Sequence, residues 1–147
     1  MGRTKREAVK RVAPTEVATG TLESFARVAE GVAATTKKLE KAALLGAYFD
    51  DLSDEDLSLA ARYFAGHQFA LHDARTTNVG GGLLRDAISE VTGLEVENLR
   101  PRYVRLGDSG EVAHEAFAET GAETSAPRHT LAGTQNLIQT LSETRGT

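Results

Sequence analysis

The chain has 147 residues, of which 40% are hydrophobic and 26% are charged, a composition typical of one soluble globular domain. It contains no cysteine, which excludes disulfides and thiolate metal sites and fits a reducing compartment. No apolar run reaches the length of a membrane span, so we expect a cytoplasmic protein without a membrane partner.

The net charge of −4 is unevenly distributed along the chain. Residues 1–16 carry five basic and two acidic side chains, so this segment has a charge of +3 and the remaining residues have −7. A uniformly basic nucleic-acid-binding protein is excluded, whereas a protein with one basic face is not. Apolar periodicity is weak in this region, and Pro14 and Gly20 interrupt it. Residues 1–21 are therefore predicted to be a disordered basic leader, and residues 22–147 a helical domain.

Apolar residues at helical spacing predict three helices in the first half of the domain. The first is expected from about Thr21 to Thr35, and the second begins at a break formed by residues 36–38. Ser53 and the acidic residues after it predict the cap and first turn of a third helix, which Gly66 ends. Alternating strand patterns are absent. The predicted fold is all-α, a compact domain of about six to seven helices with no sheet.

The longest irregular stretch inside the domain is residues 67–79. It contains His67, His72 and Asp73, a combination that invites a metal interpretation. Their spacing matches no standard helical histidine pair, and no third histidine or second carboxylate lies nearby. Surface-loop histidines are the preferred interpretation, and no metal ligand is predicted.

A polar turn followed by three glycines opens the next predicted helix. Asn78 stands just before the glycines, where its side chain is expected to cap the first turn, and Gly93 is expected to end the helix in a left-handed conformation. The residues that give this helix an apolar face are Leu84, Ala87, Ile88 and Val91.

A helix that starts with glycines leaves several backbone N–H groups unpaired and unshielded. Together with the positive end of the helix dipole, these groups form a site for an anion. A flexible turn before a core helix explains the same pattern without a ligand. Both interpretations remain open from this stretch alone.

Two features follow the glycine-led helix. A tyrosine is surrounded by three arginines, Arg100, Arg102 and Arg105. These arginines are suited either to hold phosphates or to form a solvated helix face. Asp108 and Glu111 have the spacing of a capping box, which explains Asp108 without a catalytic role.

The last predicted helix begins near Thr130, after a small polar loop at residues 121–128. It carries an apolar stripe that no later element covers, so we expect marginal stability or self-association. The stripe consists of Leu131, Leu137, Ile138 and Leu141.

Three segments carry a family resemblance. Residues 25–49 form two helices with a threonine and two lysines between them, and residues 59–88 include the turn Asn78-Val79-Gly80-Gly81. Residues 103–113 contain Gly107-Asp108-Ser109-Gly110. In this order, and with the helix from Thr130, these segments resemble the N-terminal DNA-binding domain of ATP-dependent DNA ligases. The resemblance covers about residues 22–146.

The resemblance implies an all-helical domain that clamps nicked duplex DNA and touches its phosphate backbone across the minor groove. Carried onto this sequence, it places Thr36 and Lys38 at one phosphate contact. It places a main-chain contact at Asn78, Val79, Gly80 and Gly81. The residues that the sequence pattern itself adds to the candidate DNA-binding set are Gly82, Arg85, Arg102 and Arg105.

The adenylation motif of that family, Lys-x-Asp-Gly, is absent from this sequence. We therefore expect no catalytic residue and no cofactor in this chain, with ATP and magnesium needed only by a separate catalytic module. The expected partners are nicked double-stranded DNA and that catalytic module, and the chain is interpreted as part of a ligase that lacks the last helices of the domain. The alternative is a helical protein–protein interaction module without DNA affinity. An independent enzyme would need a nucleophile–base or metal constellation, and none is found.

Overall fold

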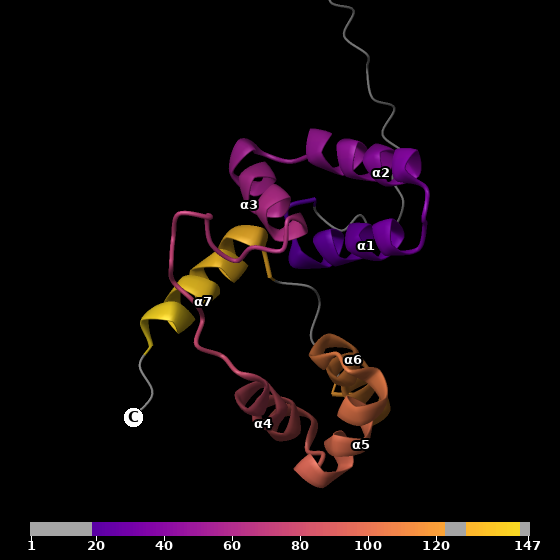
Figure 1. Ribbon diagram of the computed structural model, residues 1–147, viewed down its shortest axis with the longest axis vertical. Helices are drawn as coiled ribbons and strands as arrows, with labels where there is room; N and C mark the ends of the chain where they lie inside the picture. The colour runs from indigo at the N-terminus through magenta and orange to yellow at the C-terminus, as the bar shows by residue number, and fades with distance from the viewer. Residues whose placement is uncertain (1–18, 123–128, 145–147) are drawn as a thin grey trace, which may run out of the picture.

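A computed structural model describes residues 19–122 and 129–144. The predicted leader therefore lies outside the described residues except for its last three, and residues 123–128 of the predicted loop also lie outside them. Within the described ranges the chain forms seven helices and no sheet, so the all-α prediction is confirmed (Figure 1). The helices are α1 (Leu22–Ala33), α2 (Lys38–Asp50), α3 (Asp54–Phe64), α4 (Gly81–Thr92), α5 (Val96–Leu106), α6 (Ser109–Thr120) and α7 (Leu131–Glu143).

Side-chain caps start four of these helices. In each case the side-chain oxygen accepts a hydrogen bond from the backbone N–H three residues later, which contributes about 1 kcal/mol. The four caps are Thr21, Ser53, Asp108 and Thr130. The predicted caps at Ser53 and Asp108 are thus confirmed, with 3.2 Å from Ser53 Oγ to the N–H nitrogen of Asp56 and 2.8 Å from Asp108 Oδ1 to that of Glu111.

Helices α1, α2, α3 and α7 form a first group around one hydrophobic cluster. α1 packs along α2 and α7 packs along α3. Phe25 of α1 contacts the rings of Tyr63 and Phe64 of α3, at centroid distances of 5.9 and 4.6 Å. The buried residues of this cluster are Tyr48, Leu59, Ala60 and Leu131.

The burial of α7 differs from the prediction. Leu131 is fully buried against the first group, so the expectation that the whole apolar stripe is uncovered is wrong for the first turn of the helix. The stripe is covered there because α7 packs back on α3. Leu137, nearer the end of the helix, is 56% exposed.

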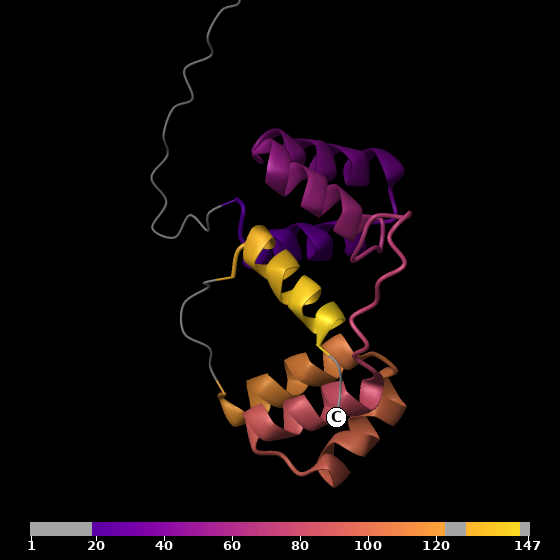
Figure 2. The ribbon, with the colours of Figure 1, turned by 90° about the vertical axis from the view of Figure 1, so that its left-hand side faces the viewer.

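Helices α4, α5 and α6 form a second group with a separate hydrophobic cluster. All three pack against one another, and Figures 1 and 2 show them together below the first group. The buried residues are Ile88, Leu99, Val112 and Ala116. Among the described residues, the two clusters have no member in common.

The apolar face predicted for α4 is mostly exposed. Ile88 is buried, but Leu84 and Val91 are 41% and 62% exposed. The helix meets its neighbours through a side centred near Ile88 and the partly buried Ser89 and Thr92, which turns the rest of the apolar face to solvent. In the described residues, no helix has the length and apolarity that crossing a membrane requires.

Mutation of Leu99 tests the core of the second group. Leu99→Ala should lower the free energy of unfolding by about 2–5 kcal/mol, because the side chain is fully buried and its loss leaves a cavity. Val104→Ala on the same helix, at a position 88% exposed, should change it by less than about 0.5 kcal/mol. Chemical denaturation followed by circular dichroism measures both, and equal effects would contradict the assigned core.

Candidate nucleic-acid interface

In the part of the chain that the structure describes, no side chain caps the start of α4. Gly80 is the N-cap residue, with φ −87° and ψ 167°, and the N–H of Leu84 donates to its carbonyl oxygen at 3.1 Å. Within the described part of the chain, the N–H groups of residues 81–83 have no acceptor. Three backbone donors therefore point outward at the positive end of a helix of 12 residues.

Asn78 does not have the predicted capping role. It lies two residues before the N-cap, in the left-handed region with φ 54°, and its Oδ1 accepts a hydrogen bond from Thr76 Oγ1 at 3.0 Å. The helix starts later than the turn signal suggests, so the cap falls on a residue without a side chain. The predicted end of α4 is confirmed, since Gly93 adopts φ 73°.

Nothing in the described residues requires glycine at positions 80–82. None of the three has a positive φ, and a Cβ added at each would meet no atom within 4 Å. Each glycine lowers the stability of a helix by about 1 kcal/mol relative to alanine at the same position. The consequence of the missing side chains is that the three N–H groups can be approached closely from outside.

Thr36 and Lys38 lie at the start of α2, in the turn after α1. Thr35 Oγ1 donates to Glu40 Oε2 at 2.6 Å and Lys37 Nζ lies 3.0 Å from Glu40 Oε1, and these contacts lower the pKa of Glu40. Lys38 is exposed and has no ion pair among the described residues. Its charge is therefore available to an external anion, whereas that of Lys37 is shared with Glu40.

Two arginines of α5 are paired within the chain, whereas the exposed Arg100 has no ion pair among the described residues. Arg102 contacts Glu115 and Glu119 of α6, and Arg105 contacts Glu115 at 2.6 Å. Hydrogen bonds from Arg105 lower the pKa of Glu115. The two arginines join α5 to α6, and a phosphate would have to compete with these carboxylates for them.

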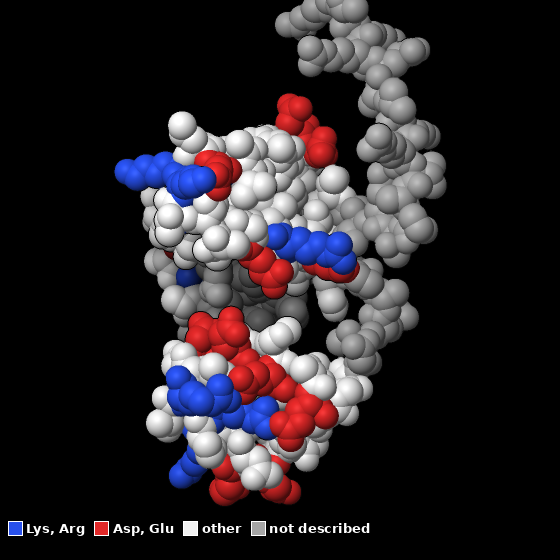
Figure 3. Space-filling model, turned by 90° about the vertical axis from the view of Figure 1, so that its right-hand side faces the viewer, with Lys and Arg blue, Asp and Glu red and all other residues white. Residues whose placement is uncertain are grey.

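The predicted residues are spread over both groups of helices. Thr36 and Lys38 belong to the first group, whereas residues 78–82 lead into the second. Arg85, in the first turns of α4, pairs with its neighbour Asp86 at 3.1 Å. Figure 3 shows basic and acidic side chains interspersed on one face of both groups, without a continuous basic patch. The part of the candidate site with free donors is thus the start of α4, supplemented by Lys38.

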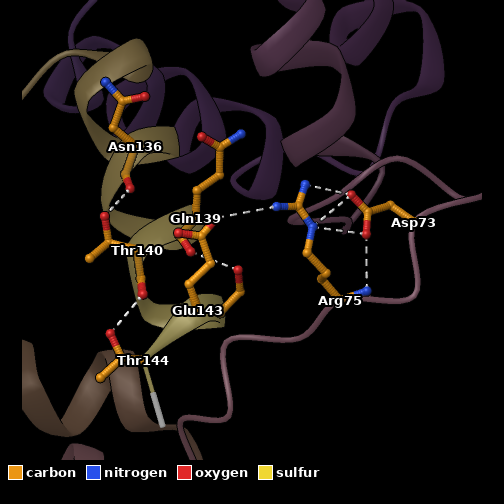
Figure 4. Close-up of polar contacts among 8 residues, drawn as sticks. Asp73, Arg75, Asn136, Gln139, Thr140, Glu143 and Thr144 are labelled. Carbon is orange, nitrogen blue, oxygen red and sulfur yellow. Dashed lines mark hydrogen bonds and ion pairs between the residues drawn. The ribbon is translucent and has the colours of Figure 1, made fainter.

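The connecting segment, residues 65–80, contains a cluster that the sequence pattern did not indicate. The guanidinium of Arg75 lies 4.9 Å from the centroid of the buried Phe69 ring and forms hydrogen bonds of 2.7–3.1 Å with the carboxylate of Asp73. Its Nη1 lies 3.9 Å from Glu143 Oε1 of α7. Figure 4 shows the guanidinium between the two carboxylates. The Asp-x-Arg spacing of Asp73 and Arg75 is the sequence signal that could have indicated their pairing.

Two histidines, His67 and His72, lie in the connecting segment. His67 and His72 are both exposed. Among residues 19–122 and 129–144, no three histidine, aspartate or glutamate side chains gather in a way that could hold a metal ion.

The sequence also matches proteins of known family. The family model described as DNA ligase N terminus matches residues 21–147. The chain belongs to this family. The resemblance to the N-terminal domain of ATP-dependent DNA ligases is thereby confirmed, and both groups of helices lie within the matched residues.

Individual DNA ligases give the extent of the similarity. A probable DNA ligase of Opitutus terrae is 36% identical over 100 residues, which cover 66% of this chain and 10% of that protein. A probable DNA ligase of Koribacter versatilis is 32% identical over 90 residues, covering 61% and 16%. The DNA ligase of Natronomonas pharaonis is 27% identical over 133 residues, covering 84% and 24%. The matched part of this ligase N-terminal domain therefore spans between a tenth and a quarter of these relatives.

The ion pair in the connecting segment of the ligase domain should persist to low pH. Hydrogen bonds from Arg75 lower the pKa of Asp73 from its ordinary 3.8 to about 2. The pKa of Asp73 is lower in the folded protein than in the unfolded chain. The ion pair therefore contributes fully to the stability of the folded state above pH 3.8, and this contribution is lost as pH falls through about 2. An NMR titration of the Asp73 carboxyl carbon should give this low pKa, and Arg75→Ala should return it toward 3.8. An ordinary pKa in the intact chain would contradict the pairing.

Proposed function

We propose that this ligase N-terminal domain holds nicked duplex DNA through contacts to the phosphate backbone, for nick sealing in replication and repair. The observation that carries the proposal is the start of α4, where three N–H donors have no acceptor among the described residues and lie behind glycines that these residues do not require. Backbone donors at a helix N-terminus bind phosphate oxygens well and carry no sequence information. The domain would therefore position DNA without reading its sequence.

We propose that the start of α2 makes a second contact with DNA. Lys38 is exposed and unpaired among the described residues, and Thr36 precedes it in the same turn. Because this turn and the start of α4 belong to different groups of helices, a duplex would touch both groups. Arg85, Arg102 and Arg105 would contribute a nearby positive potential, reduced by their carboxylate partners.

We also propose that this domain serves the activity of a whole ligase. The relatives named as DNA ligases are four to ten times as long as the parts that match. We infer a catalytic module as a partner, to which ATP and magnesium would bind and which would use DNA held by this domain. Such a ligase would act in the cytoplasm. Affinity of the domain alone is expected on the order of 10⁻⁴–10⁻⁶ M at physiological salt, as for other non-specific binding.

A helical protein–protein module is the second candidate, favoured by the exposed side of α4. Leu83, Leu84 and Val91 are 57%, 41% and 62% exposed on this one helix, and exposed apolar surface of this kind is a candidate for a protein interaction site. The two functions differ in their response to salt. Phosphate binding releases counterions and weakens steeply with salt, whereas docking of an apolar helix face does not.

Replacing glycines at the start of α4 tests the proposed phosphate site. Gly81→Val with Gly82→Val should weaken binding to nicked duplex at least about tenfold, because hydrogen bonds to a charged group contribute about 1.5–3 kcal/mol. The added side chains point toward the helix N-terminus and crowd the donors. Fluorescence anisotropy at several salt concentrations measures the affinity.

The matched control is Gly46→Val in α2. A Cβ at Gly46 also meets no atom within 4 Å, and the residue lies inside a helix away from the proposed contacts. This variant should bind as the intact chain does. Neither variant should lower the unfolding midpoint, because valine is no worse than glycine in a helix. Unchanged affinity in the double variant would show that the assigned site is wrong.

A further inference from the structure

The orientation of the two groups of helices requires a physical cause. The described residues provide no hydrophobic cluster that includes both groups, and the helix pairs that pack closely lie within one group or the other. One connection between the groups is residues 65–80, and the other contains residues 123–128, outside the described ranges. How the groups sit relative to one another therefore depends strongly on the path of residues 65–80.

Arg75 contacts three residues, two in this segment and one on α7. Its guanidinium lies over the ring of Phe69, donates to both carboxylate oxygens of Asp73, and reaches Glu143 on α7. The backbone N–H of Arg75 also donates to Asp73 Oδ1 at 3.0 Å. The first two partners close the segment on itself, and the third ties it to the first group. Figure 4 shows Asp73 and Glu143 on either side of the guanidinium.

We propose that Arg75 is a positioning residue that holds the connecting segment against α7 and thereby sets the orientation of the α4–α6 group. Gly80, the N-cap of α4, follows Arg75 by five residues along the chain. A change in the path at Arg75 therefore moves the start of α4 relative to the start of α2. The orientation itself is independent of DNA; its use in aligning two phosphate contacts rests on the proposed function.

The contacts require arginine rather than a positive charge alone. A planar guanidinium can stack on a ring while its edge donates to one carboxylate and another nitrogen faces a second. A lysine ammonium is a point charge and cannot make these contacts together. Arg75→Lys is therefore expected to resemble Arg75→Ala more than the intact chain.

Distances between spin labels on the two groups test the proposal. The chain has no cysteine, so Ala43→Cys in α2 and Val104→Cys in α5, both at exposed positions, give two specific labelling sites. Pulsed electron resonance should give a narrow distance distribution in the labelled chain without DNA. Arg75→Ala should broaden it at least about twofold, and Arg75→Lys should broaden it to a similar degree.

Arg27→Ala is the matched control. Arg27 is also exposed and paired with a carboxylate, but its partner, Glu23, lies on the same helix at 2.5 Å. The distribution should stay narrow in this variant. Equal broadening with Arg27→Ala, or an unchanged distribution with Arg75→Ala, would overturn the proposal.

Glu143→Gln separates orientation from folding. This change removes the charge that Arg75 meets on α7 and leaves Phe69 and Asp73 in place. It should broaden the distribution while the helical circular-dichroism signal and the melting temperature are retained. If Arg75→Ala loses its helical signal, an unchanged width in Glu143→Gln overturns the proposal. If the intact chain does not bind DNA, the proposed function is wrong, but the distance distributions still test the role of Arg75.

Discussion

The division of the buried apolar residues into two clusters determines most of the architecture. Tyr48 and Leu131 lie in one cluster and Leu99 lies in the other, and among the described residues no cluster includes both groups. Each group is stabilised mainly by its own burial, since apolar contacts are the largest favourable contribution to folding. The geometry between the groups then depends on weaker polar contacts in residues 65–80. This arrangement is consistent with the proposal that one duplex contacts both groups.

The two main candidate DNA contacts lie at helix starts that have no side-chain cap among the described residues. Ser53 and Asp108 cap the starts of α3 and α6, whereas the starts of α2, α4 and α5 have no side-chain cap among the described residues. At α4 the glycines also remove the side chains that would keep a ligand away from the backbone. Donors that are fixed in direction and accessible suit a repeated, sequence-independent group such as phosphate. Membership of the DNA ligase N-terminus family and the local geometry thus support the same proposal independently.

Local signals in the sequence were sufficient for the helices and for most of their ends. Ser53 and Gly93 act through neighbours three or four residues away, so their roles can be predicted without knowing the fold. The exposure of Val91 could not be predicted, because periodicity identifies an apolar face but not whether another helix covers it. The pairing of Arg105 with Glu115 depends on α5 packing against α6, which is not a local property. Arg75 is intermediate, since its pairing with Asp73 is local but its contact with α7 is not.

The most direct test of the account is to observe the amide groups at the start of α4 while DNA is added. In a titration of the ¹⁵N-labelled chain with nicked duplex, the N–H signals of residues 81–83 should show the largest shifts. A duplex of unrelated sequence should give the same pattern, because phosphate contacts do not distinguish bases. Signals of residues 81–83 that stay unchanged while others shift would place the DNA contact elsewhere, and no shift anywhere would contradict DNA binding by this domain.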